Sequence, residues 1–181
     1  MNRPNRKTIR LQNYDYAQGG AYFITICTWQ REMLFGEITG GEMTLNPLGH
    51  IVQEEWQRTE QLRPYITLDQ FIVMPNHVHG ILFIVENQPN VGAQRAAPLH
   101  NTSQNPNVKS KSLGAIVRAF KSAATRRINR MNSTPGSPVW QRGYWDRIIR
   151  NGKELHNTRQ YILNNPLNWT DDENHPQNFG K

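Results

Sequence analysis

The first hydrophobic segments of the chain have the β-branched and aromatic character of strands. Residues 21–28 (AYFITICT) follow a Gly-Gly pair and predict a strand. Residues 34–38 and 43–45 flank a second Gly-Gly pair at 40–41, an arrangement typical of a β-hairpin. One long strand and one hairpin are therefore expected in this part of the chain.

The pattern then takes the period of a helix. From Pro47, apolar side chains recur at spacings of three and four, and Pro64 ends the predicted helix. Two apolar runs follow, 66–74 and 77–85, joined by a Pro-Asn turn at 75–76, and they predict two more strands. Because the second run is apolar on both faces, we expect it in the centre of a sheet.

The second half of the chain carries two further helical patterns. Residues 86–112 are rich in Asn, Gln, Ser and Pro and predict a long, flexible connection. Residues 140–149 are typical of an extended segment, and 152–164 of a last helix, which Pro166 stops. Between this connection and the extended segment, a helix is predicted from residue 113. Its apolar face is formed by Leu113, Ile116, Val117, Phe120, Ala124 and Ile128.

The order of these elements, β-ββ-α-ββ-loop-α-β-α, indicates the α+β class. Strands that are clustered and mostly joined by hairpins predict an antiparallel or mixed sheet with helices packed on it. The length of 181 residues suits a single domain, 1–181, with a flexible connection at about 86–112 and a tail at 170–181 that could be disordered.

Composition narrows the class of protein. The only cysteine, Cys27, cannot form a disulfide within the chain, so a reducing cytoplasm is the expected compartment. No apolar run reaches the roughly 20 residues of a membrane span, and the first ten residues lack the apolar stretch of a signal peptide. We expect a soluble, cytoplasmic protein that has no membrane partner.

Positive charge is concentrated in two blocks of the chain. The net charge is +7, but residues 1–10 carry four basic and no acidic side chains, and residues 109–159 carry twelve basic and two acidic ones. Residues 11–108 carry four basic and nine acidic side chains. The basic blocks suit a polyanion, most often a nucleic acid, and the solvated surface of a basic protein is the alternative.

Two histidines stand at the start of the strand predicted at 77–85. Because strand side chains alternate between faces, His77 and His79 point to the same side and can converge on one metal ion. A hydrogen-bonded pair of histidines near a strand end is the alternative, and a third ligand is needed to favour the metal site.

Tyr161 and Asn165 lie four residues apart on the last predicted helix. Residues at this spacing share one side of a helix, beside the apolar stripe of Leu155 and Ile162. The helix thus presents a phenol and an amide oxygen together, as a nucleophile and a hard ligand. A packing tyrosine and a helix-terminal asparagine next to proline are the alternative.

A His-hydrophobic-His strand followed by such a helix resembles the single-tyrosine HUH transposases. Several strings resemble the branch of that superfamily associated with repetitive extragenic palindromes (REP), the REP-associated tyrosine transposases. The resemblance runs from about residue 10 to 169, and its specificity comes from the joint order of the strings. They are NYDY (13–16), FITICT (23–28), MPNHVHG (74–80), FKS (120–122), WQRGYWD (140–146) and YILNNP (161–166).

The resemblance implies a ferredoxin-like or RRM-like antiparallel sheet with helices packed on it. It also implies an enzyme that cleaves and rejoins single-stranded DNA beside hairpins of the REP type, with sequence and hairpin specificity. His77, His79 and Asn165 are then metal ligands, and Tyr161 is the nucleophile. Related enzymes are monomers or homodimers, and both states stay open. The connection at 86–112 is longer than the simplest members need.

The implied reaction needs a divalent ion. Held by these ligands, it would offset charge on the scissile phosphate and align the attack of Tyr161, because a phenol with a pKa of about 10 is a weak nucleophile. The expected product is a 5′-phosphotyrosine with a free 3′-OH. Mg²⁺ is the expected ion and Mn²⁺ a substitute, while Zn²⁺ stays open because two imidazoles are unusual ligands for Mg²⁺.

Basic and aromatic side chains of the second half are the candidate DNA contacts. The block at 109–130 is expected to contact phosphates, and the aromatic residues near 140–145 to stack on unpaired bases. Core packing is the alternative for at least one tryptophan, and Lys121 could instead lie near the reacting phosphate. The candidates are Lys109, Lys111, Arg118, Lys121, Arg126, Arg127, Arg130, Arg142, Tyr144 and Trp145.

Two other functions account for parts of this pattern. A non-catalytic single-stranded nucleic-acid binding protein on the same fold would explain the basic block but leaves the histidines and the tyrosine without a role. A metal-dependent hydrolase of small phosphoesters would explain the histidines but gives the basic block no role.

Overall fold

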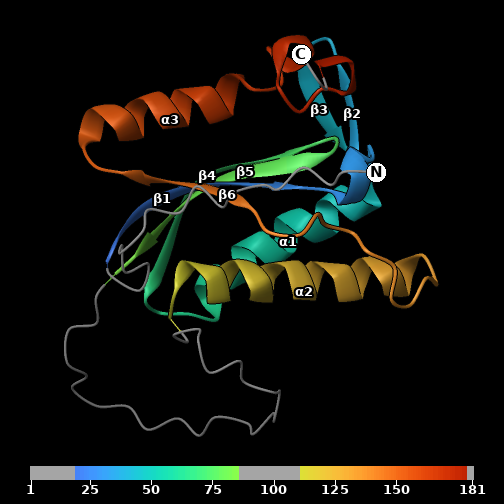
Figure 1. The fold of residues 1–181 in the computed structure, drawn as a ribbon, viewed down its shortest axis with the longest axis horizontal. Helices are drawn as coiled ribbons and strands as arrows, with labels where there is room; N and C mark the ends of the chain where they lie inside the picture. The colour runs from blue at the N-terminus through green and yellow to red at the C-terminus, as the bar shows by residue number, and fades with distance from the viewer. Residues whose placement is uncertain (1–18, 86–110, 179–181) are drawn as a thin grey trace, which may run out of the picture.

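The computed structural model describes residues 19–85 and 111–178 of the chain (Figure 1). The NYDY string, Lys109 and nearly all of the connection predicted at 86–112 lie outside these residues. Three short 3-10 helices, η1 (Trp29–Arg31), η2 (Trp169–Asp171) and η3 (Pro176–Asn178), accompany the main elements. These are β1 (Gly20–Cys27), β2 (Gly36–Thr39), β3 (Glu42–Leu45), α1 (Pro47–Gln61), β4 (Ile66–Met74), β5 (His77–Ile84), α2 (Leu113–Met131), β6 (Trp145–Ile149) and α3 (Gly152–Asn164).

Four strands form one antiparallel sheet in the order β4-β5-β1-β6. The succession β1-α1-β4-β5-α2-β6 is the βαββαβ order of ferredoxin-like folds, so the predicted fold class is confirmed. Strand β5 lies in the interior of the sheet, as its two apolar faces predicted. Strands β2 and β3 pair with each other in a separate hairpin.

Helices cover both faces of the sheet (Figure 1). Helices α1 and α2 lie on one face, and α3 lies on the other. Alternation along β5 separates the two cores, because Val78 and Leu82 join the cluster under α1 and α2 whereas Ile81 packs with Phe23 and Ile162 under α3. The two histidines have the parity of Ile81 and therefore face α3.

Helix α3 is fixed at its first turn by reciprocal capping. The Asn151 side chain accepts a hydrogen bond from the Glu154 amide at 2.9 Å, and the Glu154 carboxylate accepts one from the Arg150 amide at 2.9 Å. The first bond satisfies an amide group that a helix start leaves without a partner, and the second ties the residue before the cap to the first turn. The helix therefore begins at a defined residue, which sets the direction of the side chains farther along it.

The predicted extended segment at 140–149 is a strand only from residue 145. Trp140 instead forms an isolated bridge with Thr28 and is 7% exposed. Its ring packs against Phe35 and Phe120, at centroid distances of 5.1 and 5.8 Å. For this tryptophan, core packing is confirmed.

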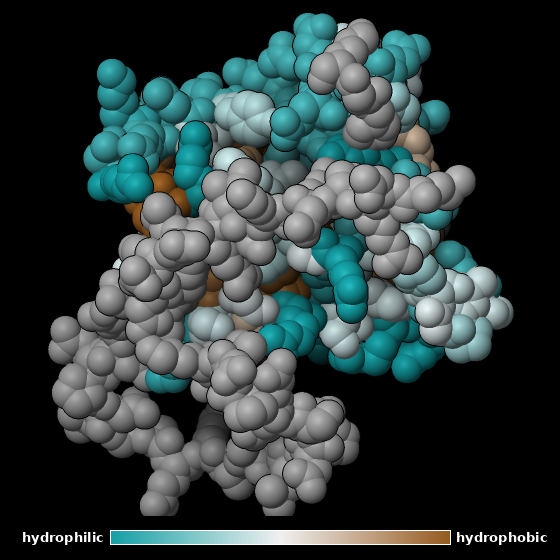
Figure 2. Space-filling model, in the orientation of Figure 1, coloured by the Kyte–Doolittle hydropathy of each residue, from teal (hydrophilic) through white to brown (hydrophobic). Residues whose placement is uncertain are grey.

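One face of the molecule can be followed in a space-filling view. On the face shown in Figure 2, hydrophilic side chains dominate, and hydrophobic ones show only in small areas between the layers. No helix within residues 19–85 and 111–178 has the length and apolar character that a membrane crossing requires.

Candidate functional site

The centre of the candidate site is the histidine pair on β5. His77 and His79 are almost fully buried, and their Nε2 atoms are 3.0 Å apart. They point to the same face of the sheet, as the alternation along the strand predicted. The two rings thus form one compact unit beneath the end of α3.

Each imidazole is oriented by a hydrogen bond at its Nδ1 atom. His79 Nδ1 lies 2.9 Å from the Thr25 hydroxyl, because the antiparallel register places Thr25 on β1 directly opposite His79. His77 Nδ1 lies 2.9 Å from the Asn76 amide oxygen. With both Nδ1 atoms engaged, the Nε2 atoms are the ones turned toward the site.

Burial keeps both imidazoles neutral. The pKa of His77 is lowered to about 3, mainly by desolvation and in part by the positive charge of Arg31, while the nearby Asn165 amide opposes the shift. Burial also places the pKa of His79 well below its usual value; His77 adds to this shift and Asp172 opposes it. Neutral imidazole is the form that binds a metal ion.

Tyr161 comes from α3 to the same point. Its hydroxyl oxygen is 3.3 Å from His79 Nε2, and its ring meets Phe23 edge to face. Burial raises the pKa of this phenol to about 12, with smaller contributions from Asp172 and Glu173, so the hydroxyl is protonated at neutral pH. A side chain that is 44% exposed can still be reached by a substrate.

Asn165 follows one turn later, at the C-terminal cap of α3. The side chain is 3% exposed, and its Nδ2 donates a hydrogen bond to Asp172 Oδ2 at 2.8 Å. Its Oδ1 is buried and has no hydrogen-bond partner among the described residues. An unpartnered, buried amide oxygen beside His77 suits a cation.

Asp172 is a site residue that the sequence did not point to. One carboxylate oxygen of Asp172 and one nitrogen each of His77 and His79 all lie within 4.8 Å of one another. Asp172 is nearly buried, and its Oδ1 accepts a hydrogen bond from the Asn174 amide. The only local signal was the acidic run 171–173 after the tyrosine helix, and such runs are common on surfaces.

Contacts between residues far apart in the sequence hold the segment at 169–178 next to the strand that carries the histidines. Asn76 Nδ2 donates to the Asn174 carbonyl at 2.8 Å, and the Arg31 guanidinium donates to the Asn174 side chain. The Trp169 ring lies 5.9 Å from the His77 ring. These contacts bring Asp172 to the histidines.

The donor set fits a hard divalent ion. The two Nε2 atoms are 3.0 Å apart, which is the distance of a hydrogen bond between the imidazoles. Two nitrogen ligands about 2.1 Å from one ion and about 90° apart have the same separation of about 3.0 Å, so the pair also suits an ion. Asn165 and Asp172 add oxygen donors, which Mg²⁺ and Mn²⁺ prefer. A cavity of about 310 Å³ opens beside them and is lined by Tyr161, Asn165, Asn168, Asp171, Asp172 and Glu173.

The predicted DNA contacts lie in different surroundings. Trp145 is 41% exposed and meets Phe23 edge to face, and the Tyr161 ring contacts the same phenylalanine. Arg118, Arg126 and Arg130 are exposed along α2, on the other side of the sheet. Further contact candidates are placed as follows: Lys111 lies near the Tyr65 ring, Arg142 is exposed, and Tyr144 packs against the core.

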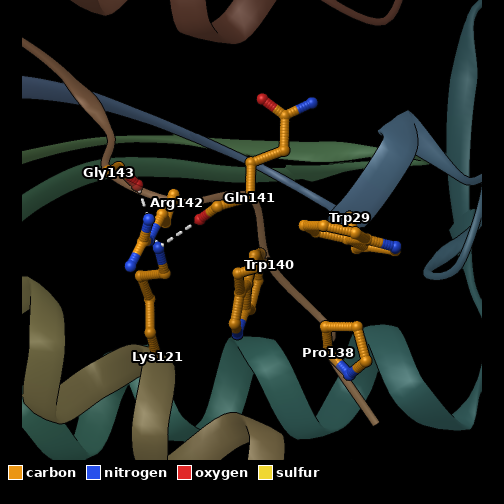
Figure 3. A pocket seen from close by; sticks show the side chains of 7 residues that line it. All are labelled: Trp29, Lys121, Pro138, Trp140, Gln141, Arg142 and Gly143. Atoms are coloured by element: carbon orange, nitrogen blue, oxygen red, sulfur yellow. Dashed lines mark hydrogen bonds between the residues drawn. The ribbon is translucent and has the colours of Figure 1, made fainter. Parts of the chain in front are cut away.

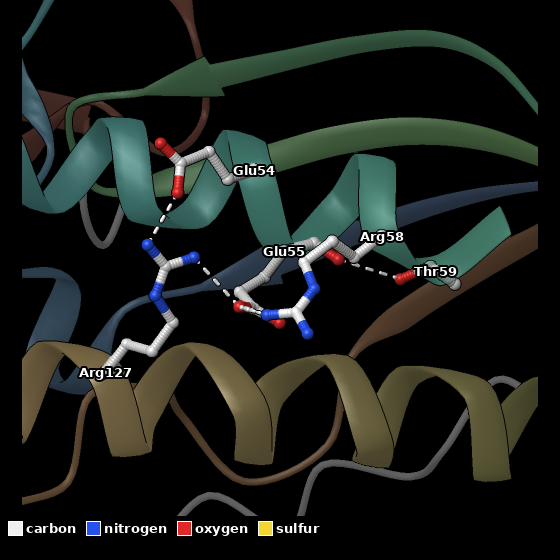
Figure 4. A network of polar contacts seen from close by, with 5 residues as sticks. All are labelled: Glu54, Glu55, Arg58, Thr59 and Arg127. Atoms are coloured by element: carbon white, nitrogen blue, oxygen red, sulfur yellow. Dashed lines mark hydrogen bonds and ion pairs between the residues drawn. The ribbon is translucent and has the colours of Figure 1, made fainter. Parts of the chain in front are cut away.

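Lys121 and Arg127 are each engaged with other parts of the chain. Lys121 Nζ donates to the carbonyl oxygens of Gln141 and Gly143 at 2.6 and 2.9 Å (Figure 3). Arg127 joins α2 to α1 through ion pairs with Glu54 at 2.5 Å and Glu55 at 2.9 Å (Figure 4). The charge of Arg127 is thus largely compensated within the protein.

Comparisons with known proteins give relatives along most of the chain. An uncharacterized protein of Haemophilus influenzae is 38% identical over 169 residues, which cover 93% of this chain and 92% of that protein. A second Haemophilus influenzae protein, named as a REP-associated tyrosine transposase, is 27% identical over 159 residues, 87% of this chain and 77% of its own. No family model matches the chain.

A solved structure shares the fold. It is a REP-associated tyrosine transposase bound to a REP hairpin, with a TM-score of 0.59, 18% identity, and coverage of 89% of this chain and 74% of that one. The sequence relatives and this common fold agree with the resemblance carried by the strings. The chain is thus similar in sequence to a protein named as a REP-associated tyrosine transposase and shares the fold of a solved member of that family.

Proposed function

We propose that the protein is a metal-dependent endonuclease and strand transferase for single-stranded DNA beside hairpins, acting through a 5′-phosphotyrosine at Tyr161. The observation that carries this proposal is the 3.3 Å separation between the Tyr161 hydroxyl and His79 Nε2, next to the His77 ring. A protonated, poorly nucleophilic phenol beside a set of metal-binding donors is the arrangement this reaction needs.

His77, His79 and Asn165 would hold the ion, and Asp172 would join them as a carboxylate ligand. When bound, Mg²⁺ or Mn²⁺ would polarise the scissile phosphate and offset the charge that develops on it. The carboxylate answers the objection that two imidazoles are unusual for Mg²⁺, because it makes half of the protein donors oxygen atoms. Thr25 and Asn76 keep the imidazoles oriented.

Tyr161 then performs the transfer. Its oxygen forms a bond to phosphorus while the bond from phosphorus to the 3′ oxygen breaks, and the leaving oxygen takes up a proton to become a 3′-OH. The phenolic proton passes to water through the exposed side of the ring. Because one P–O ester bond is exchanged for another of similar energy, a second 3′-OH can attack the phosphotyrosine, form a new bond to phosphorus and release Tyr161 without ATP.

The surfaces around the site support a DNA substrate. On the side of the site, Trp145 offers an exposed aromatic face, and its ring contacts Phe23 as the Tyr161 ring does. On the other side of the sheet, Arg118, Arg126 and Arg130 offer an exposed basic stripe for phosphates of a more distant part of the DNA. The hairpin bound in the solved relative supports a REP-type hairpin as the folded part of the substrate. We also propose that residues 1–181 act as one domain in the cytoplasm.

The test is capture of the covalent intermediate. The protein is incubated with Mg²⁺ and hairpin oligonucleotides that carry randomised single-stranded flanks and a 3′ label, and labelled protein is detected on a denaturing gel. The wild-type protein and a Tyr65→Phe control are expected to become labelled, and Tyr161→Phe and chelator-treated protein are not. Sequencing the captured strands then gives the cleavage site.

Two results would contradict the proposal. Labelling of Tyr161→Phe would remove Tyr161 as the nucleophile. Binding of the oligonucleotides without labelling, in Mg²⁺, Mn²⁺ and Zn²⁺ alike, would instead indicate a non-catalytic DNA-binding protein.

A further inference from the structure

A second pocket, of about 760 Å³, lies at the end of β1 (Figure 3). Figure 3 shows Trp29 and Pro138 on one side, Lys121, Arg142 and Gly143 on the other, and Trp140 between them. None of these residues lines the cavity beside Tyr161. The pocket is therefore distinct from the histidine site.

The pocket nevertheless lies close to that site along the sheet. Cys27, the last residue of β1, is paired with His77, and Thr28 and Trp29 follow it directly. The Thr28 amide also donates to the Asn76 carbonyl at 2.9 Å. The pocket and the histidine pair therefore lie at the same end of the sheet, so one DNA strand is long enough to reach from Tyr161 to the pocket.

The walls of the pocket are held by backbone contacts. The Trp29 amide donates to the Val139 carbonyl at 2.8 Å, and the Gln141 amide donates to the Cys27 carbonyl at 2.9 Å. Gln30 has a φ of 50°, a conformation that costs free energy in a residue other than glycine and that turns the chain sharply after Trp29. The pocket is thus preformed, which lowers the entropic cost of binding.

The side chains of the pocket combine an aromatic face with two cations. Trp29 is 40% exposed, whereas its neighbour Trp140 is buried in the core. The Lys121 ammonium gives two of its three N–H groups to carbonyl oxygens, and the third has no partner among the described residues. The pKa of Lys121, lowered by burial to about 8, still leaves it charged at neutral pH. Arg142 adds an exposed guanidinium.

We infer that this pocket binds one unpaired nucleotide of the DNA substrate, with its base stacked on Trp29 and its phosphate facing Lys121 and Arg142. Aromatic faces beside cations are how proteins hold single strands without reading their sequence. The volume lies within the range of pockets that enclose ligands of nucleotide size. This inference rests on the proposed action on single-stranded DNA and adds a subsite to it.

The experiment compares flanks with and without bases. A labelled hairpin with a randomised single-stranded flank and the same hairpin with an abasic flank are titrated in chelator, so that no cleavage occurs, and anisotropy gives both affinities. The wild-type protein is expected to prefer the flank with bases by about 5- to 150-fold, the range for one stacked base. Trp29→Ala should reduce this preference by the roughly 5- to 150-fold that one stacked base contributes, leaving only the share of other contacts such as Trp145, and Trp29→Phe should keep most of the preference.

Matched variants separate binding from folding. Met33→Ala removes another exposed side chain of the same loop and should leave the preference intact. Lys121→Gln should weaken binding to both flanks, since phosphates are present in each. The melting temperature of Trp29→Ala should equal that of the wild type, because the ring lies at the surface.

The outcomes distinguish this inference from the proposed function. If Trp29→Ala keeps the preference for bases, or if the wild type shows none, the nucleotide subsite is overturned even when Tyr161 forms its adduct. If the preference follows Trp29 but no adduct forms, the subsite stands and the proposed reaction fails. If the wild type binds neither hairpin, both are wrong.

Discussion

Arg159 on α3 forms an ion pair with Asp69 on the edge strand β4, with hydrogen bonds from two of its nitrogen atoms. Nη2 lies 2.5 Å from Oδ2 and Nε lies 2.9 Å from Oδ1, and the hydrogen bonds from Arg159 hold the pKa of Asp69 below its usual value. Tyr161 follows two residues later. The pair therefore connects the position of the proposed nucleophile to the sheet that carries the histidines.

Loosening this pair should slow the reaction more than it weakens the fold. We expect Asp69→Asn and Arg159→Lys to reduce the rate of adduct formation by up to about 100-fold, because a small displacement of a reacting group has effects of that size. Lysine keeps the charge but loses the planar fork. Glu37→Gln, an exposed acid on β2, serves as the control. An unchanged rate in both variants would mean that packing alone positions α3.

The carboxylate of Asp172 should contribute to metal affinity. Asp172→Asn is expected to weaken Mn²⁺ binding by about 10- to 100-fold, since changes of a ligand or its close partner have effects of this order. Calorimetric titration of the DNA-free protein measures it. Glu173→Gln changes an exposed acid of the same cavity and should leave the affinity nearly unaltered; equal losses would indicate a general charge effect.

The buried histidines should make the metal-free protein sensitive to acid. Unfolding returns His77 from a pKa of about 3 to its usual value, so at intermediate pH the unfolded chain binds more protons. The free energy of unfolding then falls by about 1.4 kcal/mol per pH unit for each histidine as the pH drops below about 6.5.

Thermal melting between about pH 7 and about pH 5 tests this pH dependence. The melting temperature should fall with pH in the wild type and in His50→Gln, which changes an exposed histidine. It should fall less steeply in the double variant His77→Gln, His79→Gln. The same slope in all three proteins would contradict the link to these imidazoles.

Neighbouring arginines on α2 should have different effects when neutralised. Arg126→Gln is expected to weaken DNA binding and to reduce the slope of affinity against salt by about 0.7 to 0.9, the value for one phosphate contact. Arg127→Gln should leave that slope unchanged and destabilise the fold by about 1 kcal/mol, because it breaks the bond to the nearly buried Glu55. Salt titrations and melting curves of both variants check this.

A side chain at Gly80 should lower the stability of the fold. A Cβ atom there would lie 2.6 Å from Cζ2 of Trp56, which stacks on Phe71. Gly80→Ala is expected to cost about 1 to 3 kcal/mol of stability through overpacking. Gly152→Ala, at the first position of α3 with open space around it, should be neutral or stabilising by up to about 1 kcal/mol. Denaturant unfolding of both variants measures the difference.

Local patterns were enough to place most of the fold. The parity of His77 and His79, the spacing of Tyr161 and Asn165, and the apolar stripes depend only on the geometry of one strand or helix. That geometry survives folding unchanged, so the strands, the helices and the shared face within each pair could be predicted from sequence. The approach of Tyr161 and Asn165 to the histidines was implied only by the family resemblance.

What the sequence missed depends on tertiary contacts. Asp172 reaches the histidines because Asn76 and Arg31 hold the backbone and side chain of Asn174, and no periodic pattern encodes those bonds. Arg127 resembled a free cation because its partner Glu55 lies 72 residues away. Lys121 likewise binds carbonyl groups, which leave no trace in residue identity.

The docking of α3 on its own sheet has a kinetic consequence. Tyr161 reaches His79 within a single chain, so every molecule contains the full set of proposed reacting groups. The rate of adduct formation at saturating DNA should then be first order in protein, and the specific activity should stay constant on dilution. In a dimer whose tyrosine completes the site of the other subunit, the specific activity would instead fall on dilution, because the two subunits separate.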